Sequence, residues 1–330
     1  MTHAITLMYG DGIGPEVVQS AVDIIEASRF KVSWDIKLLG LKALEQENNP
    51  LPESTLLSIK KNRIALKGPT TTPVGGGHKS ANVLLRKALD LYACIRPVKS
   101  IPGLETRYND VDLVIVRENT EGLYTGAEFE LQPGCVVSLR TTTERCCTRI
   151  AISAFEIAKL RKKLTAVHKA NILKLGDGLF LACAERVAKE YLSVIYEEAI
   201  IDALCMRMVI DPTQFDVLLL ENMFGDIVSD LCAGLVGGLG LVPGANMGHD
   251  IAVFEAVHGS APDIAGKNVA NPTAMIQSAL MMLRHMGEND KADAIERALF
   301  LVLKEKSLRT RDLGGNLSTR EFTKAVIERL

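Results

Sequence analysis

The chain has 330 residues, of which 47% are hydrophobic and 24% are charged, a balance typical of a globular enzyme with room for two ordinary domains. The formal net charge of −2 gives no electrostatic case for binding nucleic acids or an anionic membrane surface, so any basic site must be local. The seven cysteines are scattered and form no C-x-x-C pair, so neither a disulfide framework nor a zinc site is expected.

The N-terminal residues, MTHAITLMYG, lead almost at once into an apolar, strand-like run. No basic, apolar or Arg/Ser-rich targeting segment precedes that run. We therefore expect a cytoplasmic protein of a prokaryote, or a mature chain whose targeting piece is absent. The most apolar stretch, 231–245, contains five glycines and a proline and is too short and too broken to span a membrane.

Strand-like apolar runs alternate with helical patterns along the chain, and this alternation predicts an α/β fold. The predicted strands are 4–9, 31–37, 63–66, 111–116, 165–168, 193–201 and 215–220. The predicted helices are 15–28, 81–89, 149–162, 178–191, 272–286 and 318–330. No repeat or linker separates two halves, so the pattern alone gives no domain boundary.

Side chains suited to anions are concentrated around the predicted helix at 81–89. Ser80, Asn82 and Arg86 fall at offsets of two and four, within its first turns. Three consecutive glycines, Gly75–Gly77, precede them and would let the backbone pass close to a ligand. A hydroxyl and an amide beside a guanidinium indicate a site for carboxylates.

Two more arginines extend this cationic set. Arg96 follows at an expected strand end, and Arg117 ends the strand 111–116, where α/β sheets place residues that contact ligands. Together with Arg86 they provide three cations, about the number that a trianionic substrate needs for desolvation without a large penalty. We expect Arg86 to be an exposed cleft residue that adds little to the core.

Asp226 and Asp230 are four residues apart on a predicted helical run, so their carboxylates share one face. Unpaired like charges at this spacing repel each other, whereas a divalent cation would turn the repulsion into coordination. An all-oxygen ligand set favours Mg²⁺ or Mn²⁺ over zinc. Two solvated acids near a helix start remain the alternative explanation.

Six motifs in this order resemble the β-decarboxylating dehydrogenases, the family of isocitrate, 3-isopropylmalate and homoisocitrate dehydrogenases. The resemblance covers essentially the whole chain and is closest to the NAD-dependent isocitrate branch. The motifs are GDGIGPE at 10–16, the segment 67–97, RENTEGLYTG at 117–126, VHKANI at 167–172, GDIVSDLCAGLVGG at 225–238 and HGSAPDIAGKNVANPTA at 258–274.

The resemblance implies an isopropylmalate/isocitrate dehydrogenase-like α/β fold of two domains, which is not a Rossmann fold. It also implies a β-hairpin that clasps its copy in a second subunit, with active sites shared across a dimer or a dimer of dimers. The implied boundaries are 1–91 with 237–330 for the large domain, 92–121 with 143–236 for the small domain, and 122–142 for the hairpin.

The resemblance assigns the metal and proton-transfer residues. Asp202, from the neighbouring subunit, joins Asp226 and Asp230 as a metal ligand. Lys169, also from the neighbour, takes part in removing the hydroxyl proton, and Tyr124 protonates the enol after carbon dioxide leaves. Both groups have unperturbed pKa values near 10, and we expect a cationic, metal-containing cleft to favour deprotonation of both.

The family binds its dinucleotide mainly through the loop 258–272. GDGIGPE is spaced G-x-G-x-G-P, so the Rossmann interpretation, with Asp35 as its distal acid, is weak. Asp263 and Ile264 replace the lysine and tyrosine of NADP-using relatives, which implies NAD as the cofactor. The implied cofactor residues are Ile13, Thr71, His258, Gly259, Ser260, Ala261, Asp263, Ile264 and Asn271.

The expected activity is the NAD-dependent oxidative decarboxylation of isocitrate to 2-oxoglutarate, a reaction of the tricarboxylic acid cycle, with Mg²⁺ or Mn²⁺. Homoisocitrate is the alternative substrate because it differs by one methylene. Isopropylmalate would need apolar residues at the positions of Ser80 and Asn82. A non-catalytic regulatory subunit of a hetero-oligomeric enzyme is a second alternative, which the presence of all these residues disfavours.

Overall fold

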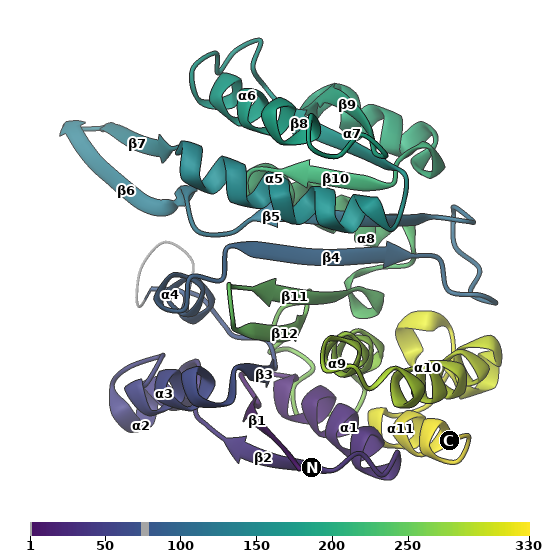
Figure 1. The fold of residues 1–330 in the computed structure, drawn as a ribbon. Helices are drawn as coiled ribbons and strands as arrows, with labels where there is room; N and C mark the ends of the chain where they lie inside the picture. The colour runs from purple at the N-terminus through teal and green to yellow at the C-terminus, as the bar shows by residue number, and fades with distance from the viewer. Residues whose placement is uncertain (1, 74–78) are drawn as a thin grey trace.

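The structure is a computed structural model that describes residues 2–73 and 79–330; the predicted glycine segment Gly75–Gly77 lies outside the described residues. One mixed sheet of ten strands runs through the molecule in the order β2-β1-β3-β12-β11-β4-β5-β10-β8-β9 (Figure 1). Its strands are β1 (His3–Met8), β2 (Val32–Ile36), β3 (Ile64–Lys67), β4 (Ala93–Lys99), β5 (Asp112–Glu118), β8 (Lys163–His168), β9 (Ile195–Ile200), β10 (Val217–Leu220), β11 (Pro243–Met247) and β12 (Ala252–Ala256).

Helices cover both faces of this sheet (Figure 1). They are α1 (Gly14–Ala27), α2 (Leu41–Glu47), α3 (Glu53–Asn62), α4 (Ala81–Ala88), α5 (Glu144–Lys159), α6 (Gly176–Ala188), α7 (Ile201–Ile210), α8 (Asn222–Leu235), α9 (Thr273–His285), α10 (Asn289–Lys304) and α11 (Thr319–Ile327). Among the described residues, buried apolar side chains form four clusters, each between one group of helices and one face of half the sheet. This layering is the α/β fold that the sequence predicts.

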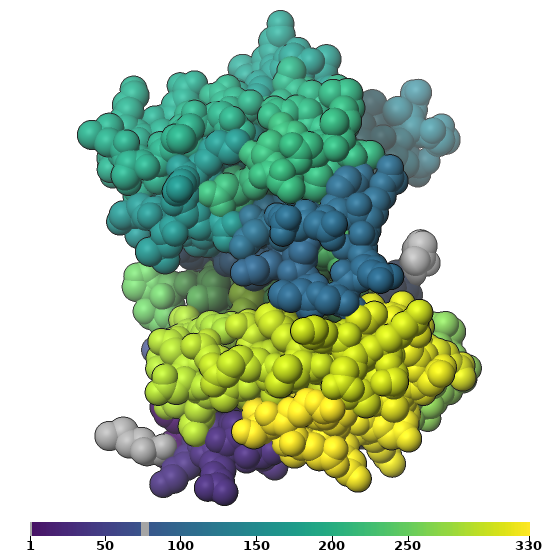
Figure 2. Space-filling view, turned by 90° about the vertical axis from the view of Figure 1, so that its right-hand side faces the viewer, coloured from purple at the N-terminus to yellow at the C-terminus, as the bar shows by residue number. Residues whose placement is uncertain are grey.

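The middle of the sheet is antiparallel. β11 pairs antiparallel with both β12 and β4, and β4 pairs antiparallel with β5, whereas the other neighbouring strands are parallel. These strands join the half that contains both termini to the half built from α5–α8 (Figure 1). Figure 2 shows the surface indented between the teal and the yellow parts of the chain. The domain boundaries expected from the sequence stay a prediction.

The predicted hairpin is present as a separate two-stranded sheet. β6 (Gly122–Gln132) and β7 (Cys135–Thr141) pair antiparallel, and Gly134 takes the positive φ of +80° that the turn requires. The hairpin projects from the body of the molecule (Figure 1), and its side chains Phe129, Leu131 and Val136 are exposed. Exposed apolar side chains on a projecting hairpin are suited to contact with another chain.

Several predicted boundaries are wrong. Arg96 lies inside β4 rather than at a strand end, because the strand continues through Pro97 to Lys99. The helix expected at 149–162 begins earlier, at Glu144, because the Thr143 side chain caps it by accepting from the Cys146 amide. The sequence pattern also missed short buried elements, such as β11 and β12, whose burial on both faces removes the polar–apolar alternation.

α8 packs closely against β5 at one glycine. A Cβ atom added to Gly225 would lie 2.5 Å from Cγ of Arg117, a side chain that is only 1% exposed and cannot move aside. Gly234, near the other end of the same helix, is exposed and would place its Cβ in open space. The distance between α8 and β5 is therefore one that only a glycine at position 225 permits.

We expect Gly225→Ala to lower the free energy of unfolding by roughly 1–3 kcal/mol, since it forces an overpacked contact. Gly234→Ala is the matched control and should raise that free energy by about 0.4–1 kcal/mol, because it restricts the unfolded chain without a clash. Urea denaturation of the two variants measures both effects. Equal stability of the two variants would contradict the close contact between α8 and Arg117.

Candidate active site

Strand register brings a row of charged residues to one face of the sheet. Lys67 on β3 is paired with Glu255 on β12, and Asn246 on β11 is paired with Cys94 on β4. Cys94 is in turn paired with Arg117 on β5, and Arg96 follows Cys94 by two residues. Directly paired residues, and residues two apart on a strand, point to the same face. Five neighbouring strands thus aim polar side chains at one place.

Glu255 holds the β3 and β12 end of this row together. It forms an ion pair with Lys67 at 2.5 Å and another with Arg86 from α4 at 3.1 Å, and it accepts a hydrogen bond from Asn246 at 2.6 Å. Burial opposes the ionised form, but the charges of Lys67 and Arg86 outweigh it and lower the pKa of Glu255 strongly. Glu255 is therefore an anion that orients two cations.

Arg86 is buried, with 8% of its surface exposed, which corrects the expectation of an exposed cleft arginine. The reason is its ion pair with Glu255, which holds the guanidinium against the sheet. Its Nε atom nevertheless has no hydrogen-bond partner within residues 2–73 and 79–330. Arg86 therefore contributes to packing and still presents a free donor.

The β5 end of the row is built around Arg117. Its Nε and Nη2 donate to Oδ1 of Asn222 at 3.1 and 2.7 Å, and its Nη1 donates to Asp226. The hydroxyl of Tyr124 donates to the other oxygen of Asp226. The guanidinium also lies over the Tyr124 ring, 5.0 Å from its centroid. Arg117 thus fixes the positions of both the tyrosine and the acid.

A cavity of about 280 Å³ opens between these groups. Four polar atoms of its lining are buried without a hydrogen-bond partner among the residues that the structure describes: Thr70 Oγ1, Asn82 Oδ1, Arg86 Nε and His258 Nε2. Buried polar atoms are usually paired, so these indicate a polar ligand. The predicted site residues that line the cavity are Ser80, Asn82, Arg86, Arg96, Arg117, Tyr124, Asp226, Asp230, His258 and Gly259.

Asp226 and Asp230 could hold a metal ion. Each places its Oδ1 atom 3.6 Å from the same Arg96 nitrogen, so the two carboxylates converge. No set of three or more His, Cys, Asp or Glu side chains suited to a metal occurs within residues 2–73 and 79–330. Two converging carboxylates in an open, oxygen-lined cavity fit Mg²⁺ or Mn²⁺ that also binds substrate or other ligands.

The pKa of Tyr124 differs from the expectation drawn from the sequence. Burial, together with the hydrogen bond to Asp226, raises the pKa of Tyr124, where we expected the cleft to favour deprotonation. Burial opposes ionisation of Asp226 too, but Arg117 lowers its pKa overall. Burial raises the pKa of Asp230. A protonated Tyr124 suits a group that donates a proton.

The backbone at the edge of the cavity joins three of the predicted cofactor residues. The Ile13 amide donates to the Ser260 carbonyl at 2.8 Å, and the Ser260 and Thr71 hydroxyls are 2.7 Å apart. Gly12 makes this approach possible, since a Cβ there would lie 1.9 Å from the Ser260 oxygen. Both oxygens of Asp11 accept backbone amides, those of Leu41 and Thr71, each at 2.8 Å.

The remaining cofactor residues lie farther along the same loop. Ala261 has a positive φ of 39°, and its carbonyl accepts from the Ile264 amide, which makes a turn with Asp263 exposed at its tip. Asn271 donates to Asp312 at 2.9 Å. Asp35, the acid of the rejected Rossmann interpretation, instead accepts from Ser58 at 2.6 Å.

Lys169 and Asp202 do not line the cavity. They form an ion pair with each other where β8 ends and α7 begins. Their contribution to a neighbouring subunit's site therefore stays a prediction. Leu175, at the start of α6, and Ile210, at the end of α7, are exposed apolar residues, at 90% and 70%.

Sequence reasoning missed four residues that organise the site: Lys67, Glu255, Asn222 and Asp11. Each acts by orienting another residue, so none has a spacing that points to chemistry. A signal was available for two of them. Lys67 and Glu255 are charged residues within otherwise apolar strand runs, IALK and AVFEA, which marks them as buried and paired.

Comparisons with known proteins find relatives along nearly the whole chain. The isocitrate/isopropylmalate dehydrogenase family matches residues 4–326. The mitochondrial NAD isocitrate dehydrogenase catalytic subunit 6 of Arabidopsis thaliana is 50% identical over 98% of this chain and 88% of its own. A mitochondrial regulatory subunit of the NAD isocitrate dehydrogenase of Dictyostelium discoideum is 49% identical over 99% and 91%. The crystal structure of isocitrate dehydrogenase from Methylococcus capsulatus is 51% identical, with a TM-score of 0.97 over 99% of each chain.

The fold and these relatives thus define an oxidoreductase of the dehydrogenase class. The chain belongs to the isocitrate/isopropylmalate dehydrogenase family.

Removing the Arg86 guanidinium tests its role in the cavity. Arg86→Ala should lower kcat/KM for the substrate by roughly tenfold to 150-fold, since a hydrogen bond to a charged group contributes about 1.5–3 kcal/mol. The buried ion pair with Glu255 means that the thermal midpoint should also fall. Arg297→Ala, at an exposed position of α10 far from the cavity lining, is the control and should leave both quantities unchanged. Native kinetics in Arg86→Ala would remove this arginine from the site.

Proposed function

We propose that the chain catalyses the NAD-dependent oxidative decarboxylation of isocitrate to 2-oxoglutarate and carbon dioxide. The observation that carries this proposal is the charge of the cavity. The charged group at the cavity has four buried cations, Lys67, Arg86, Arg96 and Arg117, and three carboxylates, those of Glu255, Asp226 and Asp230. All of them line the cavity except Lys67, which pairs with Glu255 from outside the lining. A divalent cation would raise the net charge of this group from one positive to three positive. Three positive charges match a substrate with three carboxylates.

The proposed substrate-binding residues are of two chemical kinds, charged arginines and neutral hydrogen-bonding side chains. The arginines neutralise carboxylates, and the free Nε of Arg86 is available for one of them. Ser80 and Asn82 present a hydroxyl and an amide at the start of α4, where the partial positive charge of the helix N-terminus also favours an anion. The rigid ion pairs behind these groups fix them before substrate arrives.

The cofactors of this branch are NAD and a divalent metal such as Mg²⁺ or Mn²⁺. NAD accepts a hydride from the substrate, and the metal polarises oxygens of the substrate as a Lewis acid. Asp226 and Asp230 would hold the metal, with Asp202 of a second chain as a third ligand. His258, Ser260 and the backbone around Ile13 would bind the dinucleotide.

Proton transfer falls to Tyr124 and Lys169 in this proposal. Tyr124 stays protonated because burial and Asp226 raise its pKa, so it can donate a proton to carbon after carbon dioxide leaves. Lys169, from the second chain, would help to remove the hydroxyl proton. Its present partner, Asp202, would then turn toward the metal.

The assembly that we propose is a homo-oligomer with shared sites. The exposed apolar residues of the hairpin, of α7 and of the segment before α6 support it. The relatives are named as subunits, catalytic in Arabidopsis thaliana and regulatory in Dictyostelium discoideum. A regulatory role is the second candidate, favoured only by this similarity to a regulatory subunit. The complete cavity favours a catalytic chain.

The compartment in this proposal is a reducing one, since all seven cysteines are free. The cytoplasmic location expected from the sequence stays a prediction, because the plant and Dictyostelium discoideum relatives are named mitochondrial. Across residues 2–73 and 79–330, no helix has the length and apolarity needed to cross a membrane.

Turnover by the purified chain alone tests the function. With NAD and Mg²⁺, isocitrate should give the highest kcat/KM among isocitrate, homoisocitrate and isopropylmalate. A methylene in a pocket discriminates by only about 1–3 kcal/mol, so homoisocitrate should follow within roughly 10- to 200-fold. A higher kcat/KM for homoisocitrate would select the alternative substrate. No turnover without a second kind of subunit would favour the regulatory role.

Cofactor choice should depend on Asp263. The 2′-phosphate of NADP would approach this exposed carboxylate, and two charges about 4 Å apart repel by roughly 1–4 kcal/mol depending on the local dielectric. With the ribose hydrogen bond added, we expect NAD to be preferred by at least about a hundredfold in kcat/KM. Asp263→Lys with Ile264→Tyr should shrink or invert that ratio. Equal efficiency with both cofactors in the unaltered enzyme would refute the role of Asp263.

A further inference from the structure

A buried carboxylate lies directly behind the main chain of Lys169. Asp177, in the first turn of α6, is only 1% exposed, and its Oδ2 atom accepts the Lys169 amide hydrogen at 2.5 Å. The carbonyl of Lys169 accepts from the amides of Ile172 and Leu173 at 2.9 and 2.8 Å. Both backbone groups of Lys169 are therefore fixed, and the amide is fixed by a side chain.

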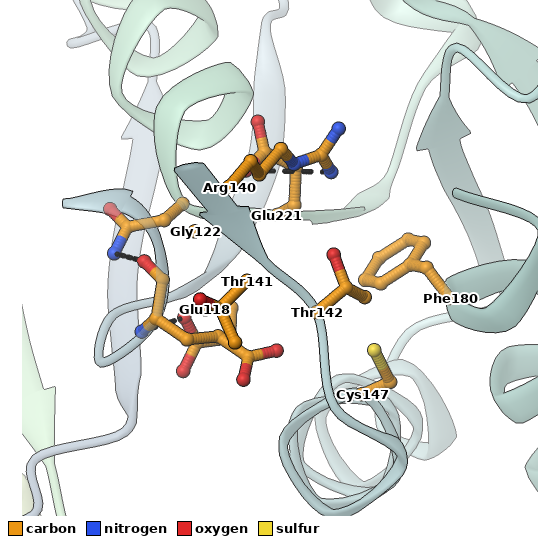
Figure 3. Close-up of a pocket in the computed structure, with 10 residues that line it drawn as sticks. Glu118, Gly122, Arg140, Thr141, Thr142, Cys147, Phe180 and Glu221 are labelled. Atoms are coloured by element: carbon orange, nitrogen blue, oxygen red, sulfur yellow. Dashed lines mark hydrogen bonds and ion pairs between the residues drawn. The ribbon is translucent and has the colours of Figure 1, made fainter. Parts of the chain in front are cut away.

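The other oxygen of Asp177 faces a cation from the hairpin. Nη2 of Arg140, on β7, forms an ion pair with Oδ1 of Asp177 at 2.6 Å. The same nitrogen is 3.7 Å from Glu221, the residue that caps α8. Figure 3 shows Arg140 reaching from the hairpin strand toward Glu221.

Little water can reach this cluster. The cavity beside it, lined by Arg140, Glu221, Thr142, Cys147 and Phe180 among others, measures about 10 Å³ (Figure 3). This is about the space of one water molecule. Asp177 must therefore satisfy its two neighbours itself, and both neighbours are donors.

We propose that Asp177 is a positioning residue, which sets the place of Lys169 by holding its main-chain amide. The proposal rests on the function proposed above, in which Lys169 takes part in proton transfer. Asp177 does not line the substrate cavity, so its effect on the reaction would pass through Lys169. A reacting group misplaced by about 1 Å can cost roughly a hundredfold in rate.

Asp177→Asn tests this role with almost no change of shape. An amide offers one oxygen and one NH₂ group, so it can accept from the Lys169 amide or face Arg140 as an acceptor, but not both. The NH₂ group then opposes a donor in either orientation. Lys169 should shift, and kcat should fall by about ten- to a hundredfold, while KM for isocitrate and for NAD stays within about threefold.

Asp216 provides a matched control. Lys169 follows the end of β8, whereas Asp216 binds the main chain at the start of β8. Its Oδ2 accepts from the amides of Lys162 and Lys163 at 2.9 and 3.1 Å, and its Oδ1 pairs with Arg161. It is thus another carboxylate between an arginine and main-chain amides, at the start of β8 rather than at its end. Asp216→Asn should lower the thermal midpoint without lowering kcat.

Mixing of variants distinguishes an effect of Asp177 on the position of Lys169 from a general loss of stability. Tyr124→Phe and Lys169→Met chains, mixed after joint refolding, should regain activity if sites are shared, because a hybrid dimer has one intact site. Asp177→Asn should behave like Lys169→Met: it should regain activity with Tyr124→Phe and not with Lys169→Met. If Tyr124→Phe and Lys169→Met chains regain no activity, with hybrids confirmed by mass, the shared site is contradicted. The fall in kcat of Asp177→Asn relative to Asp216→Asn is then the test of Asp177.

Asp177→Glu is the second variant. It keeps a negative charge for Arg140 but moves the carboxylate by one methylene. Its kcat should therefore fall, while its thermal midpoint should fall less than that of Asp177→Asn. Assays are run where circular dichroism shows the folded state. A kcat for Asp177→Asn equal to that of Asp216→Asn would overturn the proposal. So would failure of both Asp177 variants to fold, which would make Asp177 a residue of stability alone.

Discussion

Buried charge on one face of the central sheet is the constraint on which this structure depends. Lys67, Arg86, Arg96 and Arg117 are all less than 10% exposed, and each has a carboxylate within ion-pair distance. Removing one partner of such a pair leaves a buried charge that costs several kcal/mol, so the elements that bear these residues must keep their register. The chain is held in place by the same groups that would hold its substrate.

This constraint explains features that lie far from the cavity. α8 must approach β5 closely for Asp226 and Asn222 to reach Arg117, and Gly225 is the residue that permits this approach. The antiparallel strands β11 and β4 carry Asn246 and Arg96 between the two halves of the sheet. A change in the relation of the halves would therefore change the distances among the cationic groups. In the proposed function, substrate affinity would therefore depend on the arrangement of the two halves.

Much of the fold and part of the site could be predicted from the sequence. The strands that alternate with amphipathic helices carry a clear period, and the i, i+4 spacing of Asp226 and Asp230 places both carboxylates on one helix face. The pattern did not reveal that Arg86 is buried, because its burial depends on Glu255, 169 residues away. The raised pKa of Tyr124 has the same kind of origin, since Asp226 is 102 residues away. Pairings between distant segments leave no trace in local periodicity.

The central claim is that the charged group at the cavity, Lys67 included, has a net charge of one positive with protein alone and three positive with a divalent cation. Calorimetric titration of isocitrate into the NAD-free protein, with and without Mg²⁺, tests this claim most directly. We expect isocitrate to bind at least about tenfold more tightly with Mg²⁺, and Mg²⁺ to bind more tightly by the same factor with isocitrate present, because coupling between two ligands is reciprocal. Equal isocitrate affinity in the presence and absence of Mg²⁺ would contradict the account.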